Sequence, residues 1–294
     1  MSGLAERLVD GPCVLLDGGM GSMLLARGLA PGDAPERMNL RQPEVVTEVH
    51  VEYVEAGSDA VQTNTFGANP IRLAHFDLAE RCEEINRRAT DLARQARPRF
   101  VIGDIGPTGE YLPPVGTGDV VRWDEGFEMQ GRALIEAGVD ALHIETMSDL
   151  REAEVALRAV RRSSTEIPVM VSLTFDRKKR GFFTIMGDPL VESLTRLVSD
   201  GATVVGANCS IASPDLRDLA AEAQSGVPGR LVFQPNAGSP ETTAGGIRYS
   251  QAPEEFAADL APVAAAGAAA IGGCCGTDPR FIAALRRRMD GDQG

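Results

Sequence analysis

Three of the five cysteines lie in segments whose side chains could bind a soft metal ion. Cys209 ends a short apolar run, and the adjacent Cys274 and Cys275 stand between Gly273 and Gly276. Because glycine has no Cβ, the flanking backbone can let two neighbouring cysteines turn toward one point. A catalytic zinc site keeps three protein ligands and one open position. The residues therefore allow a zinc site, while a structural pair, an incidental pair and a redox-active vicinal disulfide remain open.

The other cysteines and the histidines are interpreted as structural residues. Cys13 opens an apolar run and Cys82 lies in a helical stretch, and both are expected to act as small buried hydrophobic residues. An odd number of cysteines without an export signal argues against a disulfide framework. His50 and His75 lie in helical stretches, and we expect His143 to be buried in an apolar run.

Three acidic residues stand where apolar runs end. Asp17, Asp104 and Glu145 could each bind a cation, transfer a proton or cap the following helix. Asp104 precedes a Gly-Pro turn, so a role in that turn stays open. An unpaired carboxylate at Glu145 would be costly, so it needs a partner, for which a substrate ammonium is one candidate. Gly18 and Gly19 could bind an anion at a helix start.

Eight short apolar runs recur along the chain, roughly 30 to 45 residues apart. Each run has four or five apolar residues and then changes abruptly to polar residues or glycine. A short continuous apolar run is typical of a strand that is buried on both faces of a parallel sheet. The runs begin at Cys13, Asp59, Phe100, Asp140, Pro168, Ala202, Arg230 and Ala268.

Helical patterns lie between these runs. The segment PEVVTEVHVEYVEAG begins at Pro43, and four such segments end at Gly57, Gly138, Gly201 and Gly267. Repeated βα units predict an α/β fold, a single (β/α)₈ TIM barrel over residues 1–294 with a short polar tail at 290–294. A doubly wound open sheet is the alternative. In such a barrel the active site lies at the C-terminal ends of the strands, where the cysteines and acids would meet.

Composition narrows the class of protein. The chain has 294 residues, 43% of them hydrophobic, and a net charge of −13. This apolar content supports a sizeable core and excludes disorder as the main state. The acidic balance argues against a nucleic-acid partner, which would need a basic face. No run of about 20 apolar residues exists, so we expect no membrane partner. The N-terminus carries no apolar signal core, and we expect a cytoplasmic protein.

Seven motifs together resemble the homocysteine S-methyltransferase family, from about Val14 to Met289. They are LDGGMGSML, AGSDAVQTNTFGAN, GDIGPTGEYLPP, HIET, GANCS, QPNAG and GGCCGT. The details are most similar to the homocysteine-binding module of cobalamin-dependent methionine synthase. The GGCCGT motif with an upstream strand ending in Asn-Cys is highly specific.

The resemblance implies a ligand set and a substrate site. The family's zinc ligands match Cys209, Cys274 and Cys275, which would also be the catalytic residues. The homocysteine ammonium would be held by Asp17 and Glu145. One departure is Gln234, where the methionine synthase module tends to carry Glu. The other residues implied in substrate binding are Gly18 and Gly19, whose backbone would take the carboxylate, Asn208, and Asn236, which can approach zinc when no thiol is bound.

The implied reaction converts homocysteine to methionine. A free thiol is mostly protonated at neutral pH, whereas a thiol bound to zinc is deprotonated and nucleophilic. It attacks an activated methyl group and gives a thioether, a poorer zinc ligand that is then released. No general base is needed.

The methyl donor is left open. Because no cobalamin or folate module is found in the 294 residues, we expect the methyl group from a separate methyl-corrinoid protein or from methylcobalamin. S-Methylmethionine, S-adenosylmethionine or betaine are alternative donors. Two other interpretations of the chain's function remain open. It could be a redox or metal-storage module, or a methyl-accepting subunit of a demethylation system with another thiol. The basic segment 177–180 is either a solvated turn or a docking site for an acidic donor protein.

Overall fold

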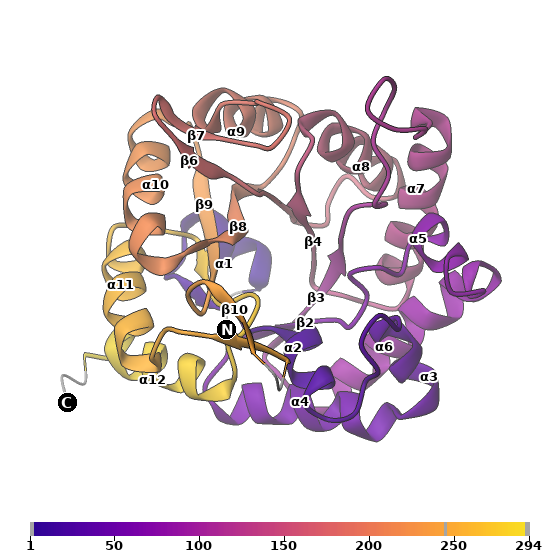
Figure 1. Cartoon of the computed structure of the whole chain (residues 1–294), viewed down its shortest axis with the longest axis horizontal. Helices are drawn as coiled ribbons and strands as arrows, with labels where there is room; N and C mark the ends of the chain where they lie inside the picture. The colour runs from indigo at the N-terminus through magenta and orange to yellow at the C-terminus, as the bar shows by residue number, and fades with distance from the viewer. Residues whose placement is uncertain (1–2, 244–245, 292–294) are drawn as a thin grey trace.

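The computed structural model describes residues 3–243 and 246–291 and contains a nearly closed barrel of eight parallel strands with helices outside (Figure 1). This confirms the predicted (β/α)₈ TIM barrel, since one strand falls in each of the eight apolar runs. The strands pair in the order β1-β12-β9-β8-β5-β4-β3-β2. They are β1 Val14–Leu15, β2 Ala60–Gln62, β3 Phe100–Ile105, β4 Ala141–Met147, β5 Val169–Leu173, β8 Val204–Ala212, β9 Arg230–Asn236 and β12 Ala270–Ile271.

Asp59 joins the two strands at the seam of the barrel. Its backbone N–H donates to Leu15 O at 2.7 Å, and its carboxylate accepts the Leu15 N–H at 3.0 Å. The same carboxylate pairs with Arg286 at 2.9 Å and Arg7 at 3.5 Å. The seam between β1 and β2 is therefore bridged by one aspartate, which two arginines from outside the barrel hold in place.

The four predicted helix ends are confirmed. Gly57, Gly138, Gly201 and Gly267 have φ values of 102°, 86°, 99° and 99°, the left-handed conformation that lets a chain turn sharply from helix to strand. The outer helices are α4 Pro43–Glu55, α6 Cys82–Gln95, α7 Val120–Glu136, α8 Leu150–Ser163, α9 Leu190–Ser199, α10 Ser213–Gly226, α11 Pro253–Ala265 and α12 Pro279–Met289; short helices α2 Met20–Leu25, η1 Pro35–Arg37, α3 Met38–Arg41, α5 Pro70–Ala74 and η2 Ala79–Arg81 lie in the loops.

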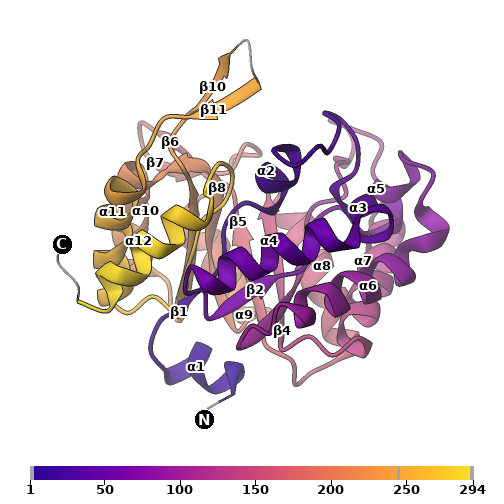
Figure 2. The ribbon, with the colours of Figure 1, turned by 90° about the horizontal axis from the view of Figure 1, so that it is seen from below.

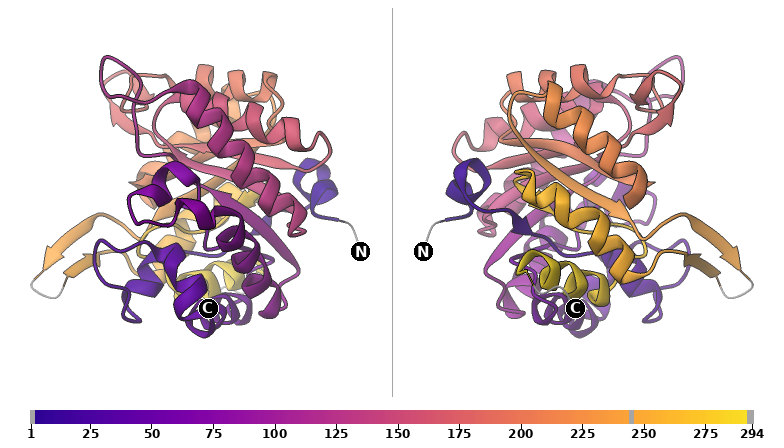
Figure 3. Two further views of the ribbon diagram at one scale, coloured as in Figure 1. Left: turned by 90° about the vertical axis from the view of Figure 1, so that its right-hand side faces the viewer. Right: turned by 90° about the vertical axis from the view of Figure 1, so that its left-hand side faces the viewer.

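Three elements were not predicted. Helix α1, Leu4–Asp10, lies at the end of the barrel opposite to the hairpin of β10 Pro240–Thr243 and β11 Gly246–Tyr249, which projects from the other end (Figures 2 and 3). A second hairpin, β6 Asp176–Lys178 with β7 Gly181–Phe183, carries the basic segment. The strands of this hairpin are three residues long and lack the continuous buried apolar run that identifies barrel strands.

The apolar side chains form two main layers. The larger cluster fills the space between the barrel and its helices. The second joins Leu4 and Leu8 of α1 to residues at the N-terminal ends of the strands, such as Val14 and Met170. Helix α1 therefore plugs the N-terminal end of the barrel, and the polar residues that follow the strands lie at the other end. Within the described ranges, no helix has both the length and the apolar composition needed to cross a bilayer.

Candidate metal centre

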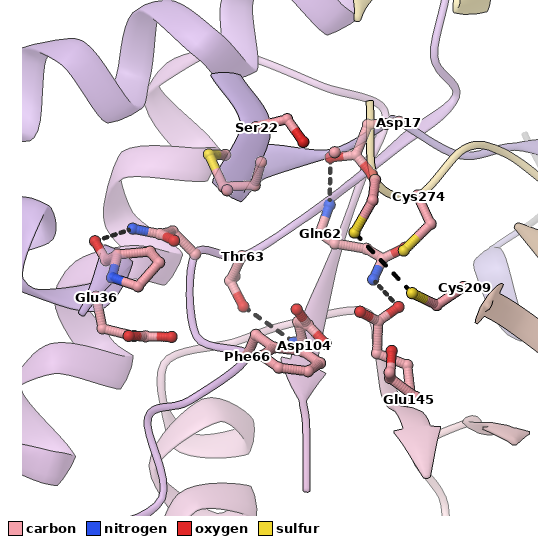
Figure 4. Close-up of a pocket in the computed structure, with 18 of the residues that line it drawn as sticks. Asp17, Ser22, Glu36, Gln62, Thr63, Phe66, Asp104, Glu145, Cys209 and Cys274 are labelled. Atoms are coloured by element: carbon pink, nitrogen blue, oxygen red, sulfur yellow. Dashed lines mark hydrogen bonds between the residues drawn. The ribbon is translucent and has the colours of Figure 1, made fainter. Parts of the chain in front are cut away.

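Three cysteine sulfurs converge at the C-terminal end of the barrel. Cys209 lies near the end of β8, and Cys274 and Cys275 follow β12 (Figure 4). Their Sγ atoms all lie within 4.8 Å of one another, and those of Cys209 and Cys275 are 4.0 Å apart. Tetrahedral zinc with Zn–S bonds of about 2.3 Å places its sulfur ligands about 3.8 Å apart. The three thiols fit such an ion with little movement.

The remaining cysteines lie elsewhere. Cys82 is buried at the start of α6, and Cys13 is partly buried just before β1. Burial raises the pKa of each thiol to about 12, so both stay protonated. All five cysteines are free thiols. The structure therefore brings together the three predicted ligands and separates them from the other two cysteines.

An irregular backbone aims Cys209 at the cluster. Cys209 and Ser210 have φ values of 56° and 45°, and the register between β8 and β9 shifts beyond Asn208. Such left-handed conformations are unusual for residues other than glycine, and they cluster at functional sites. Asn208 fixes this bulge, because its side chain accepts from the Thr146 N–H at 2.8 Å and donates to Thr146 Oγ1 at 2.7 Å. Thr146 itself has a φ of 59°.

Close backbone packing places the other two ligands. A Cβ on Gly273 would lie 2.2 Å from Thr277 Oγ1, and one on Gly276 would lie 2.2 Å from the Tyr249 ring. Gly276 also has a φ of 80°. These contacts give a physical reason for the glycines around Cys274 and Cys275. The Cys275 N–H donates to Asn236 Oδ1 at 3.1 Å, which ties the segment to β9.

Hydrogen bonds within the thiol cluster shift the pKa values of its members in opposite directions. Hydrogen bonds with Cys274 and Cys275 lower the pKa of Cys209 to about 3. The same contacts with Cys209 raise the pKa of Cys275 to about 12 and also raise that of Cys274. The cluster therefore favours a thiolate at Cys209, and thiolate sulfur is a ligand that zinc prefers.

A cavity of about 430 Å³ opens beside the sulfurs. Loops that follow β1 and β2 form much of its wall. Among its described lining residues, Arg72 is the one basic residue. Its lining includes four largely buried carboxyls, those of Asp17, Glu36, Asp104 and Glu145. An acidic cavity next to a thiolate cluster is suited to a ligand that carries both a thiol and a cationic group.

Gln62 orients two of these carboxyls. Its backbone N–H donates to Asp17 Oδ2 at 2.9 Å, and its side-chain Nε2 donates to Glu145 Oε2 at 3.2 Å (Figure 4). Gln234 Nε2 in turn donates to Gln62 Oε1 at 2.8 Å and to Gly273 O at 3.2 Å. Burial raises the pKa of Glu145 to about 7 and raises that of Asp17 as well. Sequence reasoning missed Gln62, although its place at the end of β2 was a usable signal.

The third carboxyl of the group belongs to Asp104. It is 7% exposed, and its Oδ1 has no hydrogen-bond partner among the described residues. The Asp104 N–H donates to Thr63 Oγ1 at 3.0 Å, and Thr65 Oγ1 donates to Asp104 O at 2.6 Å. The side chain lines the cavity. A role of this carboxyl in the following turn has no support from these contacts.

Of the other four residues implied in substrate binding, two line the cavity and two are not among its described lining residues. Gly18 and Gly19 line the cavity, but the Gly19 N–H already donates to Thr277 O at 3.0 Å and to its Oγ1 at 3.2 Å. Asn208 and Asn236 are not among the described lining residues, and their contacts hold the ligand-bearing backbone. The roles of these four residues in substrate binding stay predictions.

His143 is buried as expected. Its Nε2 lies 2.7 Å from Ser172 Oγ, and its Nδ1 lies 3.7 Å from Glu145 Oε2. Burial lowers the pKa of His143 to about 3, so the ring is neutral. It packs below the carboxyl and does not reach the sulfur cluster as a ligand.

Sequence comparisons find curated relatives of this chain. The chain is 32% identical to methionine synthase of Mycobacterium tuberculosis over 302 residues, which covers 95% of this chain and 24% of that protein. It is also 32% identical to methionine synthase of Mycobacterium leprae, over 98% of this chain and 25% of that protein. The chain thus spans about a quarter of the length of these curated relatives.

Solved structures of a homocysteine methyltransferase are also similar to this chain. The metallated form of the homocysteine methyltransferase MmuM from Escherichia coli matches with a TM-score of 0.79 and 27% identity, covering 95% of this chain and 97% of that one. Its oxidized form matches with a TM-score of 0.81 and 27% identity, over 97% and 99%. The family model described as homocysteine S-methyltransferase matches residues 14–289. The chain therefore belongs to the homocysteine S-methyltransferase family.

Proposed function

We propose that the protein is a zinc-dependent thiol S-methyltransferase that converts homocysteine to methionine. The observation that carries this proposal is the placement of Cys209, Cys274 and Cys275 against buried carboxyls in one cavity. Zinc bound by the three cysteines would deprotonate a substrate thiol and keep it nucleophilic. A ligand with a thiol at one end and an ammonium at the other matches both halves of the site.

The chain's own residues would bind and orient the substrate. Asp17 and Glu145 accept hydrogen bonds from the substrate ammonium, and Gln62 keeps their other oxygens in place. Burial strengthens these contacts because little water competes for them. The substrate sulfur forms a bond to the methyl carbon as the bond between that carbon and its carrier breaks. The product thioether carries no negative charge, so it would be a weaker ligand than the thiolate for a zinc ion held by the three cysteines.

We propose that the methyl group comes from a separate methyl-corrinoid protein or from methylcobalamin. The similarity to methionine synthase, of which the chain matches about a quarter, supports this source. The outer part of the cavity supports a second candidate. There Phe66 and Phe76 line the wall beside Arg72, whose guanidinium lies 5.7 Å from the Phe66 ring centre. Because the Arg72 cation already lies over the Phe66 ring, Phe76 and the acids of the cavity are the groups that would suit a small onium donor, such as S-methylmethionine, S-adenosylmethionine or betaine.

A donor panel tests both candidates. The zinc-loaded protein is mixed with homocysteine and, in turn, methylcobalamin, S-methylmethionine, S-adenosylmethionine and betaine, and methionine is measured. Turnover with methylcobalamin supports the corrinoid source, and turnover with an onium compound supports the second candidate. If homocysteine binds but another thiol is methylated faster, the chain is better described as a methyl-accepting subunit of a demethylation system.

The basic hairpin is the proposed contact for a corrinoid protein. Arg177 is already paired with Asp215 at 3.1 Å and with Asp218, and Lys178 pairs with Asp176 at 3.1 Å. In the part of the chain described, residues 179 and 180 form no ion pair. Reversing the charges of 177–180 is expected to slow methyl transfer from a protein donor at low salt and to leave homocysteine binding intact. Unchanged transfer kinetics would contradict this contact.

Metal analysis separates this proposal from a redox or storage module. One zinc per chain supports the transferase, whereas a reversible disulfide between Cys274 and Cys275 without zinc supports the redox module. We also propose a cytoplasmic location, because thiol ligands persist in a reducing compartment.

A further inference from the structure

The carboxyl of Asp104 has no task in the proposed reaction and no partner that explains its burial. It comes from β3, on the wall of the cavity that also holds Asp17 and Glu145 (Figure 4). Its Oδ1 is buried without a hydrogen bond, and no arginine or lysine lies within ion-pair distance among the described residues. Burying a carboxyl without a partner costs free energy, so a ligand that supplies one would recover that cost.

Glu36 shows what a satisfied carboxyl in the same cavity looks like. It is 3% exposed, and its Oε1 accepts the Gly67 N–H at 2.6 Å. Burial raises the pKa of Glu36, and the positive charge of Arg72 opposes this rise. Glu36 therefore holds a loop together within the protein, whereas Asp104 offers a free oxygen to the cavity.

The hydrogen bonds of Gln62 determine which carboxyl oxygens remain free to accept from a substrate ammonium. Gln62 occupies Oδ2 of Asp17 and Oε2 of Glu145, and Asp17 Oδ1 is also buried without a partner. An ammonium group has three N–H donors. Two acceptors, from Asp17 and Glu145, leave one N–H unsatisfied. Burial and the charges of Glu145 and Asp17 raise the pKa of Asp104, so the three carboxyls interact with one another and a cation placed among them would favour their ionised forms.

We propose that Asp104 is a third substrate-binding carboxyl, which accepts the remaining N–H of the substrate ammonium. This inference rests on the proposed function and adds a specificity rule to it. Thr63 positions the residue, because its hydroxyl accepts the Asp104 N–H at 3.0 Å. With three carboxyls around one ammonium, the cavity selects thiols that carry a free amino group and rejects thiols that lack one.

Three thiol probes test the rule. Homocysteine carries both charged groups, 4-mercaptobutyrate lacks the ammonium, and 3-aminopropane-1-thiol lacks the carboxylate. Binding of each to zinc-loaded wild type and Asp104→Asn is measured by titration calorimetry. Loss of one hydrogen bond between charged groups is expected to weaken homocysteine and 3-aminopropane-1-thiol by about tenfold to a hundredfold. Binding of 4-mercaptobutyrate is expected to stay within about twofold.

Two further variants complete the test. Asp104→Ala removes the buried carboxyl without introducing a new polar group, and it is expected to show the same loss, with the fold checked by its zinc content and unfolding midpoint. Glu36→Gln removes a carboxyl charge from the same cavity away from the ammonium, and the ratio of the two amine-bearing thiols to 4-mercaptobutyrate should not change.

The possible outcomes distinguish failure of this inference from failure of the proposed function on which it rests. If wild type binds homocysteine and Asp104→Asn weakens all three probes equally, or none, the inference is wrong and the proposed function stands. If wild type binds no thiol although it holds zinc, both are wrong.

Discussion

Replacing Gln62 by leucine is expected to weaken homocysteine binding while zinc stays bound. The side chain makes two hydrogen bonds that leucine cannot make, one to Glu145 Oε2 at 3.2 Å and one from Gln234 Nε2 at 2.8 Å. None of the three zinc ligands depends on the Gln62 side chain directly. The Gln62 N–H still holds Asp17, since that bond comes from the backbone.

The size of the effect follows from the charge and burial of Glu145. A hydrogen bond to a charged group contributes about 1.5–3 kcal/mol, and at 8% exposure Glu145 has little water to replace it. Homocysteine affinity should therefore fall by about tenfold to a hundredfold. Gln234→Leu is the matched control, because it removes only neutral hydrogen bonds, worth about 0.5–1.5 kcal/mol each. Its loss of affinity should be smaller.

The pH dependence gives an independent check. Burial already raises the pKa of Glu145 to about 7, and the hydrogen bond from Gln62 opposes that rise. Removing this bond raises the pKa further, so less of the carboxyl is ionised at neutral pH. The affinity loss of Gln62→Leu should therefore be larger at pH 6.5 than at pH 8.5. Calorimetric titrations at both pH values, with zinc content measured in parallel, test this. Equal affinities for wild type and Gln62→Leu, or a greater loss in Gln234→Leu, would refute the reasoning.

Three other changes probe the metal, the backbone and a buried acid. Cys209→Ala should lose zinc in equilibrium dialysis while Cys82→Ala keeps it, because only the former is a ligand; equal zinc content in both would exclude the site. Gly276→Ala should lower the free energy of unfolding more than Gly267→Ala in urea titrations, since both φ values are positive but only at 276 does the Cβ meet an aromatic ring, at 2.2 Å. Burial raises the pKa of Glu152 from 4.5 to about 7, so its contribution to stability is complete below pH 4.5 and is lost as pH rises to 7. Glu152→Gln should therefore reduce the fall in unfolding free energy across this interval by up to about 3 kcal/mol, and an identical pH slope would contradict the shift.

The barrel could be predicted because its signals are local. A buried parallel strand needs an apolar run, and a sharp turn from helix to strand needs a left-handed residue, which glycine supplies at Gly57 and Gly138. The hairpin of β10 and β11 has neither signal, because its strands project from the barrel and do not cross its core. Helix α1 was missed for a similar reason: it is one short helix that buries only the apolar side chains of Leu4 and Leu8, and their burial depends on the barrel end that they cover.

The convergence of three cysteines was predictable because cysteines are rare and the strand-end rule places three of them together; their role as zinc ligands stays a prediction. The glutamines that orient the carboxyls of Asp17 and Glu145 were missed. The position of Gln62 at the end of β2 could have marked it as a cavity residue, but a glutamine side chain does not by itself indicate which groups it contacts. Gln62 matters because two donors on one residue reach Asp17 and Glu145, which come from different strands. This relation appears only when the closed barrel brings the ends of β1, β2 and β4 to one cavity. Likewise, nothing in the sequence distinguishes the free carboxyl of Asp104 from the satisfied one of Glu36.

The hydrogen bonds around Gln234 connect the metal segment to the ammonium site. Gln234 Nε2 contacts the carbonyl of Gly273, the residue before Cys274, and also Oε1 of Gln62, which holds Glu145. Two amide side chains therefore connect the segment of Cys274, one of the residues that would hold the zinc, with the carboxyl that would bind the substrate nitrogen. The site can select a thiol-bearing amino acid by its length only if the two ends of the site are fixed relative to each other. We expect these hydrogen bonds to fix the spacing between the sulfur site and the ammonium site, so that the cavity selects for the length of the substrate. In homocysteine this spacing is one methylene longer than in cysteine.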